Sequence, residues 1–160
     1  MTNAAPAPAP ARDARPGPEP RSAFARFIPL STRWMDNDLY GHLNNVVYYS
    51  LFDTAVNQYL IEQGALDLHG GEVIGLVVET RCNYFESLAF PQRVEAGLRV
   101  AHRGRSSVRY EIGLFAEGAP SCAARGHFVH VYVDRETRRP VPALPAAYLN
   151  ALQALEGLPK

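Results

Sequence analysis

One long helix in a chain of strands is the feature that most constrains the fold. From Val46 to Gln63 apolar residues recur every three or four positions, which predicts a helix about 27 Å long. Asn44 or Asn45 is the expected N-cap, and Gly64 is the expected stop. Apolar side chains cover more than half of its circumference, so the helix must be largely buried. Most of the remaining elements are strands, so it must lie against a sheet.

Alternating apolar residues predict the strands. A first strand over 24–34 contains Pro29, which suits an edge position. Later segments predict four more strands and a short C-terminal helix, in the order 73–84, 92–100, 106–115, 121–133 and 145–155. The fold class is therefore α+β, with an antiparallel sheet wrapped around one long helix.

Composition bounds the domain organisation and the partners. Residues 1–22 are rich in Ala and Pro and are expected to be a disordered tail, followed by a single domain over 23–160. The 16 basic and 16 acidic residues balance, which disfavours nucleic acid or a membrane surface as a partner. No apolar run is long enough to span a membrane. Cys82 and Cys122 are expected to be reduced, which favours a cytoplasmic protein, and the sequence offers no metal site.

The candidate site lies directly before the long helix, in the polar segment 33–45. This segment places Asp36 and Asp38 ahead of a helix N-terminus. Backbone N–H groups without partners and the positive end of the helix dipole meet there. Such a corner can polarise a carbonyl group beside a carboxylate.

A pattern in this segment resembles the 4-hydroxybenzoyl-CoA thioesterase family of hotdog-fold acyl-CoA thioesterases. The pattern is D-x-D-x-x-G-H-x-N-N, formed by Asp36, Asp38, Gly41, His42, Asn44 and Asn45, and the resemblance covers roughly 26–145. It implies a hotdog fold with five or six antiparallel strands around the central helix. It also implies an acyl-CoA substrate, no cofactor, and a homodimer or homotetramer with sites at the subunit interface.

By that resemblance, Asp38 is the catalytic carboxylate and the backbone N–H of Asn45 polarises the thioester carbonyl. The sequence leaves open whether Asp38 is a nucleophile or a general base. Asp36 is the rival carboxylate, although it is better suited to ordering the loop or holding Arg33. His42 is expected to shape the site through hydrogen bonds. Three further residues are expected to contact the substrate. Gly41 would let the substrate approach the backbone, and Asn44 would also cap the helix. Tyr48 would line the acyl pocket.

A separate group of two arginines and a serine is a candidate for binding the phosphates of coenzyme A. It comprises Arg103, Arg105 and Ser106 in an expected hairpin turn. Two other functions stay open. One is a hotdog hydratase or dehydratase acting on hydroxyacyl thioesters, with His42 and Asp38 moving protons. The other is a non-catalytic domain that binds acyl-CoA. The identity of the acyl group is beyond the sequence.

Overall fold

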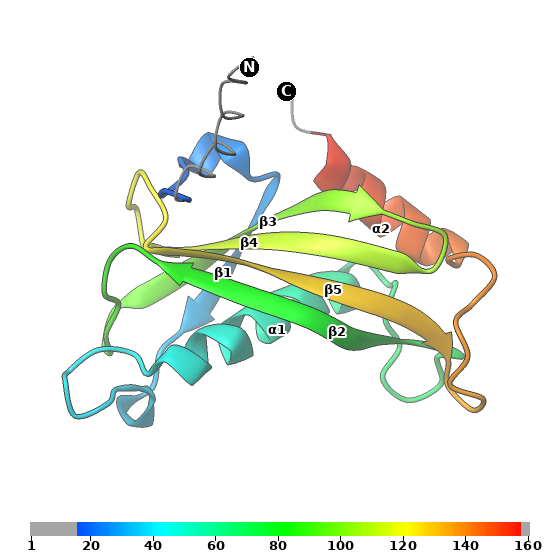
Figure 1. The fold of residues 1–160 in the computed structure, drawn as a ribbon, viewed down its shortest axis with the longest axis horizontal. Coiled ribbons are helices and arrows are strands. Elements are labelled where there is room, and N and C mark those ends of the chain that lie inside the picture. Colours follow the sequence, from blue (N-terminus) through cyan, green and yellow to red (C-terminus); the bar gives the residue numbers. More distant parts are fainter. Residues whose placement is uncertain (1–15, 158–160) are drawn as a thin grey trace, which may run out of the picture.

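The computed structural model describes residues 16–157 and shows a five-stranded antiparallel sheet with a long helix against one face (Figure 1). The strands are β1 (Arg26–Ser31), β2 (Val73–Tyr84), β3 (Arg93–Arg103), β4 (Ser107–Ala116) and β5 (Ala124–Asp134). The helices are α1 (Asn45–Glu62) and α2 (Ala146–Glu156), with short 3-10 turns at Arg21–Ala23 and Trp34–Asp36. The strand order is β1-β3-β4-β5-β2, which confirms the predicted hotdog architecture.

The two edge strands, β1 and β2, differ in length and in the side chains that they expose. β1 is shorter than predicted, because Trp34–Asp36 turns into a 3-10 helix, and it carries Pro29 at the expected edge position. β2 is the opposite edge and pairs only with β5 among the described strands. Its register shifts between Val77 and Glu79, and the side chains of Leu76, Val77 and Val78 are exposed.

The central helix begins and ends where the sequence predicts. Asn44 is the N-cap and its side chain accepts a hydrogen bond from the Val46 N–H at 3.1 Å. Gly64 follows the helix with a φ of 68°, a left-handed conformation that glycine adopts without strain. The buried face of α1 includes Phe52, Ala55 and Val56, which are fully enclosed.

Gly126 of β5 lets this helix approach the sheet closely. A Cβ at this position would lie 2.3 Å from the Phe52 ring and 2.4 Å from the Arg81 carbonyl oxygen. Near the C-terminal end of α1, the second helix α2 packs into the same core. There the Tyr59 hydroxyl of α1 donates a 2.7 Å hydrogen bond to the Ala151 carbonyl oxygen of α2.

Part of the outer face of the sheet, over β1, β3 and β4, is covered by residues 19–24, which we call the strap. Phe24 packs against Phe115 with ring centroids 5.6 Å apart, in a notch where Gly97 and Gly113 have no side chains. Arg21 binds Glu95 at 2.8 and 3.0 Å, which lowers the pKa of that carboxyl. The predicted boundary of the tail at residue 22 is therefore too late, because the chain already contacts the sheet at residue 19. Residues 1–15 of the predicted tail lie outside the described residues.

Candidate active site

The two aspartates of the polar segment have different surroundings. Asp36 is only 2% exposed and its carboxylate accepts hydrogen bonds from the Arg33 backbone N–H at 2.7 Å, Nε at 3.0 Å and Nη2 at 2.8 Å. This pairing raises the pKa of the Arg33 guanidinium. With both oxygens engaged, Asp36 orders the loop and is not available to a substrate.

Asp38 lies in a small hairpin that precedes α1. Its N–H donates to the His42 carbonyl at 2.8 Å, and Asn37 and Leu43 form the next antiparallel bridge. Gly41 closes the turn with a φ of 82°, and its N–H donates to the Asp38 carbonyl at 3.1 Å. One carboxylate oxygen, Oδ1, accepts the Tyr40 N–H at 2.8 Å, while Oδ2 has no hydrogen-bond partner within residues 16–157. Asp38 therefore offers one free oxygen.

The first turn of α1 offers one free donor beside that oxygen. The N–H of Asn44 donates to the Asp36 carbonyl at 2.8 Å, and the N–H groups of Val46 and Val47 are taken by Asn44 at 3.1 and 2.9 Å. The Asn45 N–H has no acceptor among the described residues. It is therefore the donor that the helix terminus can present to a ligand.

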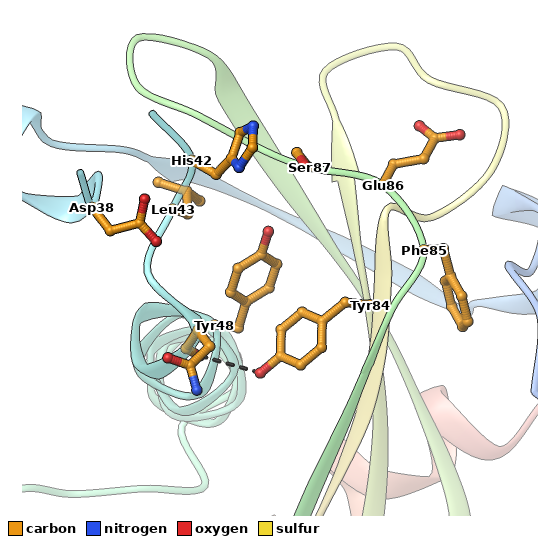
Figure 2. A pocket seen from close by; sticks show the side chains of 9 residues that line it. Asp38, His42, Leu43, Tyr48, Tyr84, Phe85, Glu86 and Ser87 are labelled. Carbon is orange, nitrogen blue, oxygen red and sulfur yellow. Dashed lines mark hydrogen bonds between the residues drawn. The ribbon is translucent and has the colours of Figure 1, made fainter. Parts of the chain in front are cut away.

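A hollow of about 320 Å³ brings Asp38 and Asn45 together (Figure 2). Its walls come from the Asp38 hairpin, the start of α1 and the loop after β2; the lining residues are Asp38, His42, Leu43, Asn45, Tyr48, Tyr84, Phe85, Glu86 and Ser87. Glu86 stands across from Asp38 and directs its carboxylate away from it (Figure 2). The hollow therefore has Asp38 and Asn45 in its lining and enough volume for a small ligand group.

A second, wider hollow of about 900 Å³ opens on the other side of the hairpin. Asp38 and Asn45 line both hollows. The second one also carries Gly41 and Asn44, together with exposed Trp34, Leu39 and Tyr40. The site is thus a junction with a hollow on each side of Asp38 and Asn45.

Two tyrosines form the floor of the smaller hollow. The rings of Tyr48 and Tyr84 meet edge to face, with centroids 4.9 Å apart at 88°. Burial raises the pKa of Tyr48, and the nearby charge of Asp38 adds to this effect. Burial likewise raises the pKa of Tyr84, whose hydroxyl donates to the Asn45 carbonyl oxygen at 3.3 Å. Both phenols therefore stay neutral and able to donate.

The structure places most predicted site residues at this junction but leaves one group elsewhere. The turn from β3 to β4, which carries Arg103, Arg105 and Ser106, lies at the opposite end of the sheet from the loop before α1 (Figure 1). The eleven residues of β3 separate the two ends, and a strand of that length spans about 36 Å. Arg103 instead pairs with Glu156 of α2 at 2.6 Å. Within one chain this group does not reach the candidate site.

The loop after β2 was not predicted as part of the site. Tyr84, Phe85, Glu86 and Ser87 come from a stretch without a recognisable motif. Their role depends on how this loop folds back, since the Leu43 N–H donates to the Leu88 carbonyl at 2.7 Å and the Phe90 N–H donates to the Asn37 side chain at 2.9 Å. The one sequence signal for this side of the hollow is the predicted strand over 73–84, which ends at Tyr84.

Between residues 16 and 157 no three His, Cys, Asp or Glu side chains lie close enough together to hold a metal ion. Neither helix in that range is both long and apolar enough to cross a membrane.

Comparison with known proteins places this geometry in a family. The model of the thioesterase-like superfamily matches residues 32–152, which include the Asp38 hairpin and all of α1. Among solved structures, the PA5185 protein of Pseudomonas aeruginosa is 58% identical, with 88% of this chain and 97% of that chain covered and a TM-score of 0.85.

Two other solved structures have assigned activities. A thioesterase of Thermus thermophilus, solved with coenzyme A and zinc, is 33% identical over 86% of this chain and 98% of that one, with a TM-score of 0.68. The 1,4-dihydroxy-2-naphthoyl-CoA thioesterase of Synechocystis is 16% identical, covers 79% and 94%, and has a TM-score of 0.71. The second similarity shows a shared fold only.

Proposed function

Because this chain belongs to the thioesterase-like superfamily and is a thioester hydrolase, we propose that its substrate is an acyl-CoA, which it cleaves to a carboxylic acid and coenzyme A. One observation carries this proposal. Asn45, whose N–H is free, and Asp38, which has a free carboxylate oxygen, line the same hollow. The relative solved with coenzyme A supports the choice of thiol.

In this proposal, the thioester carbonyl oxygen accepts a hydrogen bond from the Asn45 N–H. The positive end of the helix dipole stabilises the charge that develops on this oxygen in the transition state. Asp38 then acts in one of two ways. Its carboxylate either attacks the carbonyl carbon and expels the thiolate as a mixed anhydride forms, or it takes a proton from the water that attacks. Water completes both routes and the acid is released.

His42, Gly41 and Tyr48 have supporting roles in this proposal. His42 and Tyr48 line the smaller hollow, where the acyl group would lie. Gly41 and Asn44 line the wider hollow, where the pantetheine arm would run. A thiolate leaves without a proton donor, so the proposal assigns His42 to hydrogen bonding and not to acid catalysis.

We further propose that a second copy of the chain completes the site by pairing along β2. This strand has a free edge and exposed apolar side chains at Leu76, Val77 and Val78. Two-fold antiparallel pairing would set the Val73 end of one β2 beside the Tyr84 end of the other. The turn with Arg103, Arg105 and Ser106 lies at the Val73 end, because Val73 pairs with Asp134 and the Tyr132 N–H donates to the Ser106 carbonyl. Pairing would therefore carry this turn toward the site of the other chain.

The test is release of free thiol from short, medium, long and aromatic acyl-CoA esters. For wild type we expect turnover of at least one ester, and for Asp38→Asn a loss of about 100-fold or more in kcat. The control is Asp53→Asn, the same substitution on the exposed side of α1, which should match wild type.

Three other results would contradict parts of this proposal. Equal rates for wild type and Asp38→Asn would remove catalysis from Asp38. Thermal stabilisation by acyl-CoA without thiol release would favour a binding domain. Hydration of an enoyl ester with the thioester intact would favour the hydratase alternative.

A further inference from the structure

Tyr84 connects the edge of the sheet to the first residue of the central helix. It is the last residue of β2, and its hydroxyl donates to the carbonyl oxygen of Asn45 at 3.3 Å (Figure 2). In a helix, this carbonyl also accepts a hydrogen bond from the N–H four residues later. A second donor from outside the helix therefore ties its first residue to β2.

The peptide groups around Asn45 are held from two directions. On the preceding side, the Asn44 N–H donates to the Asp36 carbonyl, and Asp36 is itself clamped by Arg33. On the following side, the Tyr84 hydroxyl, which lies outside α1, donates a hydrogen bond to the Asn45 carbonyl oxygen. Between these two supports lies the Asn45 N–H, the one free donor of the first turn within residues 16–157.

The ring of Tyr84 is itself held in place, so its hydroxyl is a fixed support. It packs edge to face on Tyr48, which is buried in the core. Although the residue as a whole is 45% exposed, burial of the phenol raises its pKa, so the hydroxyl keeps its proton and remains a donor. The arrangement suits a positioning role, because a neutral donor on a fixed ring holds the peptide after Asn45, the Asp36 carbonyl holds the peptide before Asn44, and the peptide between them carries the Asn45 N–H.

We propose that Tyr84 is a positioning residue whose hydroxyl holds the Asn45 carbonyl, and thereby fixes the preceding peptide with the Asn45 N–H pointing into the hollow shared with Asp38. This inference rests on the proposed function, because it assumes that the Asn45 N–H polarises the thioester carbonyl. It assigns to Tyr84 a task beyond forming the wall of the hollow. The hydroxyl would act on kcat through Asn45, while the ring would act on binding of the acyl group.

Two substitutions separate the tasks of the hydroxyl and the ring. Tyr84→Phe keeps the ring against Tyr48 and removes only the donor. It is expected to lower kcat by about 10-fold with little change in KM, because a misplaced donor acts on the transition state. Tyr84→Leu also removes the ring, and it should lower kcat to the same extent and raise KM as well. Tyr148→Phe is the control, since it removes a buried hydroxyl of α2 and should leave kcat unchanged.

The amide signal of Asn45 provides a readout that does not depend on turnover. In two-dimensional 1H–15N spectra, Tyr84→Phe should shift the Asn45 signal and speed exchange of its N–H with solvent, whereas signals of α2 should stay in place. If no acyl-CoA is hydrolysed but the Asn45 signal shifts, the proposed function fails and the positioning contact stands. If hydrolysis occurs and Tyr84→Phe has wild-type kcat, or if the Asn45 signal is unmoved, the positioning role is overturned.

Discussion

Asp36 and Asp38 have different surroundings although only one residue separates them. Asp36 lies inside the loop and gives both oxygens to Arg33, so its charge serves structure. Asp38 gives one oxygen to the Tyr40 N–H and keeps the other for the hollow. The difference comes from burial and from the neighbours available to each carboxylate, because the residue type is the same.

His130 makes stability depend on pH. Its side chain is 2% exposed, and its Nε2 has no hydrogen-bond partner among the described residues. Burial lowers the pKa of His130 from 6.5 to about 4. Between these values the unfolded chain binds a proton that the folded chain does not, so stability falls as pH drops from 6.5 toward 4. The total loss from this group is about 3 kcal/mol.

Urea unfolding of wild type and His130→Phe between pH 7 and pH 4.5 measures this effect. The variant should lose less stability than wild type over the range, since it has no imidazole to protonate. His69→Gln is the matched control, because His69 is exposed and its removal should leave the wild-type slope. Parallel slopes for wild type and His130→Phe would refute the assignment.

At the scale of elements, patterns local in sequence predicted α1 well. Its apolar spacing, its cap at Asn44 and its stop at Gly64 all depend on neighbouring residues, and the structure has them as expected. The strap was missed because its partners are distant. Glu19 binds Arg99 at 2.7 Å. Phe24 packs on the sheet only where Gly97 of β3 and Gly113 of β4 have no side chains.

Gly126 sets how closely α1 can approach the sheet, and its substitution should be costly. The Cβ of Gly126→Ala would meet the Phe52 ring and the Arg81 carbonyl, so the helix or the strand must shift. Such overpacking costs about 1–3 kcal/mol. Urea unfolding checks this against Gly157→Ala, where an added Cβ meets nothing within 4 Å and stability should hold. If Gly126→Ala were as stable as wild type, the core would have to rearrange around the added Cβ without a cost in free energy of unfolding.

At the scale of the molecule, the candidate site is open on both sides within a single chain. The sequence pattern identified Asp38, Asn45 and His42, which the structure brings to one hollow. It did not identify the loop that faces them, because no motif marks residues 84–87. Nor could it show that Arg103 lies about one strand length away, since strand order and direction decide that placement.

Pairing along β2 predicts a dimer that a charge on this edge would disrupt. Val78 is 60% exposed on β2, and Val78→Lys would place a charge in the proposed contact. We expect light scattering to show twice the chain mass of 17.6 kDa for wild type and a monomer with reduced turnover for the variant.

Leu68→Lys tests whether the position of the added charge matters. Leu68 is 58% exposed in the loop before β2, so this variant should remain a dimer. A monomeric wild type at micromolar concentration, or a dimeric Val78→Lys, would speak against the proposed pairing.

The strap also sets an order of events during synthesis. The Glu19 N–H donates to the Cys122 sulfur across 103 positions of the chain, so the strap leaves the ribosome long before its partner exists. At the usual speed of translation, that delay is roughly 5–20 s. Until Gly97 and Gly113 have been made and their strands have paired, Phe24 has no notch to enter. A segment translated before the strands that it covers is therefore among the last to reach its place.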